Sequence, residues 1–301
     1  MFDFRKKVLH KLYEMFPFNI RGDAHIDRGG EDLISCIIPT SKRSYELDRI
    51  LYCLSMQDSG RNSFEVIVIE DGTSSETEEI VQQHSSVMNL KLKTNERPTC
   101  AVGELRNQGL ELSVGRYVLF LDDDTLLLQA NFLSKMHEKF QRTPDVDCIV
   151  IPGETDRCLL NNRYDHLTKY SFGCACVGYT REMLAQLGGF FNNMASYEDI
   201  ELSIRFATVG GNVCYEDELK YHHPPFYFTS WKKPISNGLC FLRLWRRYSL
   251  PVWILCYFNA LRFLPFLLSP SLKLRQLGKI SGGFLVAPLL TLVRRGVKYG
   301  H

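Results

Sequence analysis

The chain has 301 residues, of which 45% are hydrophobic and 23% charged, with a formal net charge of +2. This length can bury one large hydrophobic core or two smaller ones. The ten cysteines are scattered without a C-x-x-C pair, which argues against a zinc cluster or a disulfide framework and favours a reducing compartment. No secretory signal is expected, because residues 1–18 lack an apolar core and a small-residue cleavage site.

The chain alternates short β-rich runs with helical patterns from residue 33 to about residue 215, which is typical of βαβ units. Strands are predicted at Leu33–Pro39, Phe64–Gly72, Leu90–Thr94, Arg116–Asp124 and Asp147–Gly153. Helices are predicted at Leu47–Leu54, Ser75–His84, Gly103–Ser113, Asn131–Gln141 and Tyr197–Gly210, the last with Ile200, Ile204 and Ala207 on its apolar face.

The last quarter of the chain differs in charge from the rest. Of the 36 Lys and Arg residues, 13 lie in residues 219–301, which contain no Asp or Glu; the other 23 accompany all 34 acidic residues. Two apolar runs in this segment are interrupted by Arg262, Pro265 and Pro288 before they reach the roughly 18 residues of a spanning helix. Such a segment favours peripheral attachment to an anionic membrane face. Packing on the rest of the chain or on a partner is the alternative.

Polar side chains lie where three predicted strands end: Thr40 and Ser41, then Asp71, then Asp122–Asp124. In α/β sheets of this type, ligands bind beyond the carboxyl ends of the strands. Three adjacent carboxylates repel one another and need a positive partner. Hard oxygen ligands suit Mg²⁺ or Mn²⁺, which commonly bridge to a substrate phosphate. An isolated Asp-x-Asp is weak support, because acids at such junctions also cap helices.

Two other functions of acidic loops do not fit this stretch. An EF-hand needs glycine at its sixth position and glutamate at its twelfth, where this chain has Leu127 and Leu133. Phosphatases of the haloacid dehalogenase type carry a motif similar to Asp-x-Asp-x-(Thr/Val) after a strand. This chain has Leu126 at the fifth position of that motif. A calcium-binding loop and that phosphatase class are therefore both excluded.

Five stretches occur in the order seen in family 2 glycosyltransferases of the GT-A fold: "SCIIPTSKR", "VIVIEDGTSSE", "ELRNQGLELSVGRYVLFLDDDT", "LGGF" and "YEDIELSIRFATVG". The resemblance covers about residues 33–225. It implies an α/β fold with a mixed, mainly parallel central sheet flanked by helices. Residues 1–32 would then be an N-terminal extension, and residues 226–301 a basic, amphipathic, helical C-terminal region.

The resemblance also implies an activity. The enzyme would transfer a sugar, with inversion and with Mg²⁺ or Mn²⁺, from a nucleotide-diphosphate sugar to a glycan or lipid-linked saccharide. Together with the basic C-terminal segment, this activity is expected at the cytoplasmic face of a membrane, with no nucleic-acid partner. Residues implied to bind the donor nucleotide are Pro39, Thr40, Ser41, Asp71, Arg106, Asp122 and Asp123. Residues implied to bind metal are Asp122 and Asp124, with His222 or His223 at the position where many enzymes of this fold place a histidine on the metal; a loop histidine that binds no metal is the alternative.

Asp199, next to Glu198, would be the catalytic base. Inversion requires one in-line displacement and hence a single base on the acceptor side. Each assignment has a structural alternative. Asp199 could close a capping box with Ser196, and Asp71 could belong only to a turn. Ser41 stands where the family usually has an aromatic residue, so the identity of the nucleotide base stays open.

Two other functions compete with this interpretation. A sugar-nucleotide nucleotidyltransferase also combines an α/β sheet with a metal, but it should carry a glycine-rich loop after the first strand, and "PTSKRSYE" has none. A non-catalytic scaffold that binds sugar nucleotides or membranes is the other alternative, although both acidic groups are intact.

Overall fold

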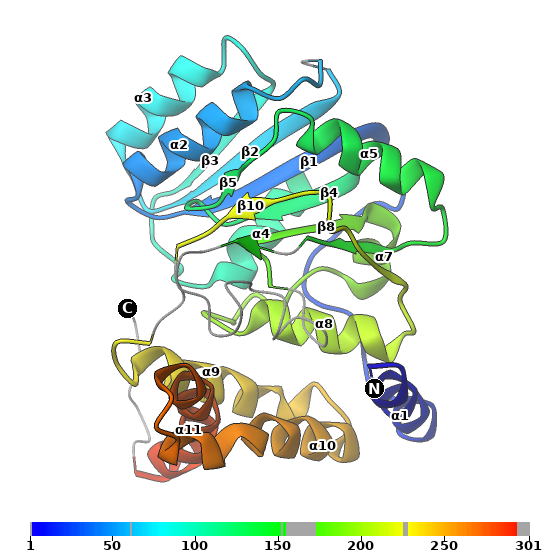
Figure 1. Cartoon of the computed structure of the whole chain (residues 1–301), viewed down its shortest axis with the longest axis vertical. Coiled ribbons are helices and arrows are strands. Elements are labelled where there is room, and N and C mark those ends of the chain that lie inside the picture. The colour runs from blue at the N-terminus through cyan, green and yellow to red at the C-terminus, as the bar shows by residue number, and fades with distance from the viewer. Residues whose placement is uncertain (1, 61, 152, 155–172, 225–227, 294–301) are drawn as a thin grey trace.

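The computed structural model describes residues 2–60, 62–151, 153–154, 173–224 and 228–293. These residues form a seven-stranded sheet and a three-stranded one (Figure 1). The large sheet has the order β3 (Leu90–Asn95), β2 (Phe64–Asp71), β1 (Glu31–Thr40), β4 (Gly115–Leu121), β8 (Cys176–Thr180), β6 (Cys148–Val150), β9 (Val213–Tyr215). The small sheet has the order β5 (Leu126–Leu127), β10 (Tyr221–His222), β7 (Gly153–Glu154).

Four neighbouring strands of the large sheet are parallel: β3, β2, β1 and β4. Strand β8 is antiparallel to both β4 and β6, which makes the sheet mixed. The sequence analysis did not predict β8, because this run of five residues is short and is interrupted by Gly178, a residue that is depleted in strands. Its central Gly178 leaves room for Met136, whose methyl group would overlap a Cβ at that position.

Helices cover both faces of the large sheet (Figure 1). One face is covered by α2 (Ser44–Ser55), α3 (Ser75–His84) and α5 (Phe132–Arg142). The other is covered by α4 (Val102–Leu112), α7 (Arg181–Leu187) and α8 (Glu198–Thr208). The apolar stripe predicted for α2 is confirmed: Leu47, Ile50, Leu51 and Leu54 are all fully buried. The bounds of the other predicted helices agree with those in the structure to within about two residues at each end. The predicted fifth strand is short, and residue 152 lies outside the described residues.

The apolar face predicted for α8 is only half-buried. Ile204 and Ala207 pack against the hydrophobic core of the C-terminal helices, as the prediction requires, but neither they nor Ile200 are fully buried. The fully buried side of the helix includes an ion pair between Glu201 and Arg205, at 2.6 Å, in which neither side chain is accessible to solvent. Because unpaired charges are almost never fully buried, these two residues could not be predicted to lie inside before their pairing was known. Arg205 also donates to the carbonyls of residues 20, 187 and 189, which ties α8 to the N-terminal segment.

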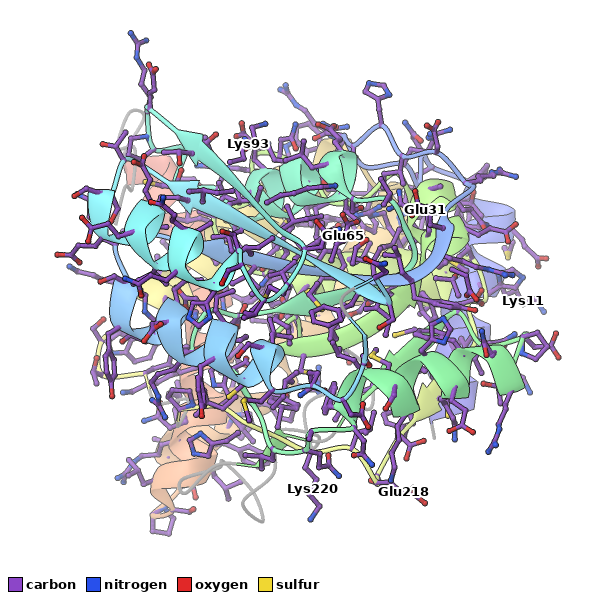
Figure 2. All side chains as sticks on the ribbon, turned by 90° about the horizontal axis from the view of Figure 1, so that it is seen from above. Lys11, Glu31, Glu65, Lys93, Glu218 and Lys220 are labelled. Carbon is purple, nitrogen blue, oxygen red and sulfur yellow. The ribbon has the colours of Figure 1, made fainter. Side chains whose placement is uncertain are left out.

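A second buried carboxylate, that of Glu65, connects neighbouring strands at the end of the sheet away from the Asp122–Asp124 edge. Glu65 of β2 lies in the interior of the molecule, while Lys220 and Glu218 point outward at its edge (Figure 2). The two carboxylate oxygens of Glu65 accept hydrogen bonds from the Ser35 hydroxyl at 2.6 Å and from the Lys91 ammonium at 2.7 Å. These contacts join β1, β2 and β3, so the parallel strands end together at the opposite edge.

The C-terminal helical unit, residues 228–293, lies beyond α8 (Figure 1). It consists of α9 (Lys232–Arg243), the 3₁₀ turn η1 (Leu244–Arg246), α10 (Leu250–Ala260), the 3₁₀ segment η2 (Leu261–Leu268) and α11 (Leu272–Val293). Helices α9 and α11 approach closely at Gly238 and Gly283, where added Cβ atoms would meet backbone of the facing helix. An aromatic core joins this unit to α8 and to α1 (Phe2–Met15). The predicted C-terminal helical extension is thereby confirmed; residues 226–227 and 294–301 lie outside the described residues.

One expectation about the C-terminal unit is corrected. Arg262 and Pro265 do not interrupt the apolar run, because α10 continues directly into η2. An 18-residue window within Leu250–Leu268 has a mean hydropathy of 1.5, and 11% of that window is buried inside the fold, so by length and composition alone this segment could cross a membrane. A proline fits here because its fixed φ is compatible with 3₁₀ winding. Trp253 turns inward and stacks on Phe241 instead of lying on the surface.

Replacing Tyr248 with Phe is expected to destabilise the protein without altering its architecture. The Tyr248 hydroxyl donates to Glu201 Oε1 at 2.6 Å in a fully buried site, and hydrogen bonds to charged groups contribute about 1.5 to 3 kcal/mol. The free energy of unfolding, measured by urea denaturation, should fall by that amount. Tyr13→Phe is a suitable control, since Tyr13 is only half-buried. An unchanged free energy would show that water replaces the lost hydroxyl.

Candidate active site

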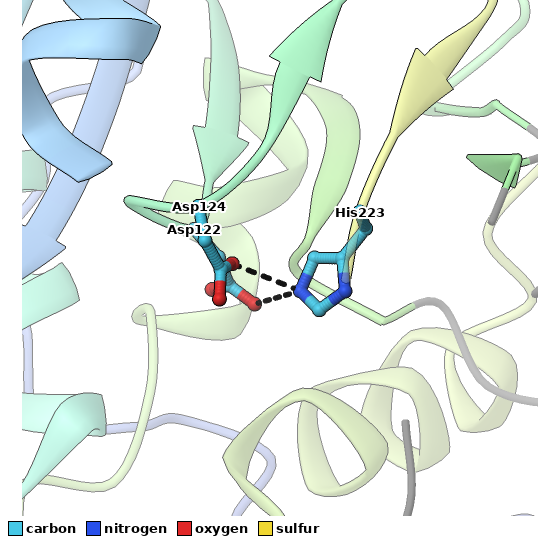
Figure 3. Close-up of side chains that lie close together, drawn as sticks. All are labelled: Asp122, Asp124 and His223. Carbon is cyan, nitrogen blue, oxygen red and sulfur yellow. Dashed lines mark ion pairs between the residues drawn. The ribbon is translucent and has the colours of Figure 1, made fainter. Parts of the chain in front are cut away.

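Three side chains with oxygen or nitrogen ligand atoms meet beyond the end of β4: Asp122, Asp124 and His223 (Figure 3). Their ligand atoms all lie within 4.8 Å of one another. His223 Nε2 is 3.1 Å from Asp124 Oδ1 and 3.6 Å from Asp122 Oδ2. The two aspartates follow β4, and His223 follows β10, which the small sheet holds next to β5. His222 lies within β10, opposite Leu126, and is not one of the three.

The donor set fits a divalent metal ion. Asp124 Oδ1 is buried and, although close to His223, receives no hydrogen bond of good geometry. A buried carboxylate oxygen with a free lone pair is costly unless a cation completes it. Two carboxylates and an imidazole are ligands that Mn²⁺ accepts, with the carboxylates also suitable for Mg²⁺.

Without a metal, protonated and cationic side chains balance the acids. Burial alone would raise the pKa of Asp122, but His223 and Arg106 hold it well below its usual range. His223 also holds the pKa of Asp124 below its ordinary value against the effect of burial. Burial in turn lowers the pKa of His223, but its contacts with both aspartates outweigh this and raise it to about 10. A metal ion would therefore displace a proton from His223.

Arg43 is a charged partner that the sequence analysis missed. Its guanidinium lies 2.6 Å from Asp123 Oδ1 and 2.8 Å from Asp124 Oδ2. The residue follows β1 in the stretch "PTSKR", but nothing in that stretch shows which carboxylate it will meet. Asp123 itself is buried and accepts from Thr40 Oγ1 at 2.8 Å. Burial raises the pKa of Asp123 to about 7, despite Arg43 and Thr40.

Removing Arg43 is expected to tighten metal binding. The guanidinium contacts one oxygen of Asp124, so it opposes a second positive charge at the same carboxylate. Arg43→Ala should lower the dissociation constant for Mn²⁺ about 3- to 10-fold, measured by isothermal titration calorimetry, which corresponds to about 1 kcal/mol. Arg49→Ala, an exposed position on α2, is the matched control. Weaker binding in Arg43→Ala would mean that Arg43 orients Asp124 for the metal.

Arg106 connects the two acidic groups of the site. It is only 3% exposed, and its guanidinium binds Asp122 Oδ1 at 2.8 Å and Glu198 Oε1 on the other side. A buried arginine between two carboxylates is a rigid, charge-balanced bridge. The strand end that carries Asp122 and Asp124 is thereby held next to the start of α8.

The remaining residues implied for donor binding lie along the same sheet edge. Pro39 and Thr40 are buried at the end of β1, and the Ser41 hydroxyl donates to the Asp71 carbonyl at 3.0 Å. The Asp71 carboxylate accepts from the backbone N–H groups of Thr99 at 2.7 Å and Cys100 at 2.9 Å. Asp71 therefore fixes the loop before α4 and is more than a turn residue.

The "RNQG" and "LGGF" stretches also prove to be in contact. Asn107 Oδ1 accepts from the Phe190 N–H at 2.8 Å, and its amide nitrogen donates to the Phe190 carbonyl at 2.9 Å. Gly189 adopts a φ of 64° and lies so close to Asn107 that a Cβ there would collide with it. The chain is thereby turned so that residues 190–199 reach the site.

Asp199 lies in the first turn of α8, and the capping box proposed for it is absent. The N-cap is Tyr197, which makes no side-chain cap, and the Ser196 hydroxyl instead lies 3.1 Å from that of Ser236. Asp199 Oδ1 accepts from the N–H of Ile200 at 2.7 Å. Burial, followed by the charge of Glu198, raises the pKa of Asp199 to about 7, although Arg106 opposes this. A carboxylate with such a pKa is suited to exchange protons near neutral pH.

Comparison with known proteins identifies relatives of the site-bearing region. The chain is 32% identical over 109 residues to poly(ribitol-phosphate) beta-N-acetylglucosaminyltransferase TarS of Staphylococcus aureus, which is 34% of this chain and 19% of TarS. The chain thus spans about a fifth of that relative. Glycosyltransferase AglE of Haloferax volcanii is 25% identical over 250 residues, 75% of this chain and 81% of AglE.

Solved structures share the fold. The mannosyltransferase PcManGT from Pyrobaculum calidifontis, solved with GDP-Man and Mn²⁺, superposes with a TM-score of 0.63 at 16% identity, over 96% of this chain and 94% of that one. TarS residues 1–349 superpose with a TM-score of 0.60 at 20% identity, over 85% and 80% of the two chains. The glycosyl transferase family 2 sequence model matches residues 35–199, more than half of the chain. With these motifs on a GT-A sheet, the chain belongs to glycosyl transferase family 2.

Proposed function

We propose that the chain transfers a sugar from a nucleotide-diphosphate sugar to an acceptor hydroxyl, with inversion and with a divalent metal. The observation that carries the proposal is the juxtaposition of a metal-suited cluster with Asp199, which Arg106 bridges through Asp122 and Glu198. The similar structures support the donor class: PcManGT was solved in complex with GDP-Man, and TarS residues 1–349 in complex with UDP-GlcNAc. The nucleotide base stays open between these two.

Asp122, Asp124 and His223 would hold Mn²⁺ or Mg²⁺. When bound, such an ion supplies positive charge where the nucleoside diphosphate leaves. Thr40, Ser41 and Asp71 line the edge on which the nucleotide would rest, next to the end of β1. Arg106 keeps Asp122 oriented toward this edge and also neutralises Glu198.

Asp199 would accept the proton of the attacking hydroxyl. The pKa of its carboxylate is raised to about 7, and Asp199 does not belong to the cluster of Asp122–Asp124. Glu198 is tied to Arg106 and is not available for the same task. One base on the acceptor side is what an inverting displacement needs.

The acceptor would be a glycan or a lipid-linked saccharide at the cytoplasmic face of a membrane. One side of α10 exposes four large apolar residues, with Phe258 65% exposed: Leu250, Ile254, Leu255 and Phe258. Leu268 at the end of η2 is 92% exposed. The same unit also carries exposed basic residues: Lys232, Arg243, Arg246, Arg262 and Arg275. Apolar side chains beside positive charge suit an anionic lipid surface.

A donor screen tests the proposed activity. The full chain is incubated with Mn²⁺ and a series of UDP- and GDP-sugars, first with a mixture of lipid-linked saccharides and then without it. Release of nucleoside diphosphate that rises with acceptor is the expected result. Release of pyrophosphate would identify a nucleotidyltransferase, and binding of a donor without any turnover would identify a scaffold.

Membrane attachment is tested by co-sedimentation with vesicles. Vesicles containing anionic lipid should carry the protein into the pellet at low salt, and neutral vesicles should carry much less, since each basic group near an anionic surface contributes about 1 kcal/mol. Ile254→Ser combined with Phe258→Ser should reduce binding about 10-fold or more. Met56→Ser, an exposed apolar position just after α2, is the matched control. Protein that stays in the supernatant with anionic vesicles would refute the attachment.

A further inference from the structure

The residue before the Glu198–Asp199 pair has an unusual backbone conformation. Tyr197 adopts φ 70° and ψ 9°, the left-handed region, and it is the N-cap of α8. Among the described residues, Lys42 and Cys100 are the other non-glycine residues with positive φ. An aromatic residue adopts this conformation only where its surroundings impose it, and such residues cluster at functional sites.

The surroundings that hold Tyr197 come from the C-terminal helical unit. Its ring meets that of Phe284 of α11 at a centroid distance of 5.2 Å and 62°, and that of Phe241 of α9 at 6.0 Å and 86°. Both angles are close to the edge-to-face arrangement that aromatic pairs prefer. Phe284 and Phe241 are themselves fully buried, so they provide a fixed socket for the tyrosine ring.

Two further contacts attach the start of α8 to the same unit. Just before Tyr197, the Ser196 hydroxyl lies 3.1 Å from the Ser236 hydroxyl of α9. One turn later, Glu201 accepts from the Tyr248 hydroxyl at 2.6 Å. Asp199 therefore lies between anchored positions on both sides.

The direction of the Asp199 carboxylate depends on this backbone. Its Oδ1 atom accepts from the N–H of the next residue, Ile200, at 2.7 Å, so the carboxylate follows the first turn of the helix. A change in the Tyr197 dihedral angles would rotate that turn and move the carboxylate with it. A displacement of about 1 Å of a catalytic group can cost on the order of 10²-fold in rate.

We propose that Tyr197 is a positioning residue, through which the C-terminal helical unit sets the orientation of the catalytic base Asp199. The unit with the exposed apolar surface then serves the chemistry as well as attachment. This inference rests on the proposed function, because it takes Asp199 as the base.

The test compares three substitutions of Tyr197. Tyr197→Phe keeps the ring in its socket and should retain kcat within about 3-fold. Tyr197→Ala removes the ring and should lower kcat about 10- to 10²-fold while donor affinity, measured by calorimetry, and the KM for donor stay nearly unchanged. Tyr197→Gly removes the ring but accepts positive φ freely, so it separates the ring from the backbone conformation. The kcat of Tyr197→Gly should fall about as much as that of Tyr197→Ala.

Two results would overturn the inference. Normal kcat in Tyr197→Gly would mean that the left-handed conformation alone, without the aromatic socket, places Asp199. Equal losses of donor-binding stoichiometry and of kcat in Tyr197→Ala would mean that part of the protein is simply unfolded.

Hydrogen exchange keeps this test independent of activity. Amides of residues 199–202 should exchange at least 10-fold faster in Tyr197→Ala than in Tyr197→Phe, while those of α4 and β4 stay unchanged. Unchanged exchange at residues 199–202 would overturn the inference even if no donor is turned over. Failure of the donor screen, by contrast, would refute the proposed activity and leave the exchange result standing.

Discussion

Replacing Asp199 with asparagine should lower turnover by about 10² to 10⁴-fold, the usual cost of a lost general base, while donor affinity stays nearly intact. Asparagine has the same shape and can keep the hydrogen bond from Ile200, but it cannot accept a proton. Steady-state kinetics with saturating donor, and calorimetry with a donor analogue, measure the two effects separately. Near-normal turnover would show that the acid serves only the helix terminus.

The pH dependence gives a second measurement on the same residue. Because burial raises the pKa of Asp199 to about 7, kcat/KM of the wild-type protein should fall about 10-fold per pH unit below pH 7. The residual activity of Asp199→Asn should lack this limb. A wild-type profile that stays flat down to pH 5 would contradict the assignment of Asp199 as the base.

Stability should change in the opposite direction to activity. The pKa of Asp199 is higher in the folded protein than in the unfolded chain, so protonation of this group favours the folded state. That contribution is complete below about pH 4 and is lost as the pH rises through about 7. Asp199→Asn should therefore melt at a higher temperature than wild type at pH 8, with the difference vanishing near pH 4. Glu198→Gln is the informative comparison, since it leaves Arg106 without one of its partners and should destabilise.

The parts of the fold that the sequence predicts are those in which local pattern and burial agree. The parallel strands β1, β2 and β4 are continuous apolar runs, and α2 carries one apolar stripe, so each can be recognised without its neighbours. Strand β8 and the inner side of α8 are different. Gly178 in β8 is explained only by Met136 of another element, and Glu201 is buried only because Arg205 and Tyr248 pair with it.

The candidate site divides in the same way. Asp122 and Asp124 could be proposed as site residues from their place at a strand end, and Asp199 from its place in an ordered set of motifs. Arg43 could not be assigned, because its partners Asp123 and Asp124 lie some eighty residues away along the chain. His223 could not be separated from His222 in the sequence, since only the pairing of β10 with β5 decides which ring faces the aspartates. Local sequence patterns do not predict which distant segments come into contact.

Replacing Asp124 with alanine should abolish metal-dependent donor binding while the fold survives. The substitution removes one proposed metal ligand, while the two cationic side chains that face Asp124 keep other acidic partners: His223 stays beside Asp122, and Arg43 stays on Asp123. The affinity for Mn²⁺ should fall by more than the 10- to 100-fold that loss of a residue merely orienting a ligand causes. Calorimetry of a UDP- or GDP-sugar, with and without Mn²⁺, is the measurement, and circular dichroism checks the fold.

The neighbouring aspartate provides the matched control. Asp123 directs its two oxygens at Thr40 and Arg43 and not at His223, so Asp123→Asn should keep the response to Mn²⁺. Substitutions at two adjacent aspartates would then affect the response to Mn²⁺ differently, because only one of the two carboxylates faces His223. If Asp124→Ala bound donor equally well with and without Mn²⁺, and as tightly as the wild-type protein does with Mn²⁺, the metal would have no role in donor binding. Arg43 and protonated His223 would then be the cations that face the diphosphate, and Asp124 would serve to hold them in place.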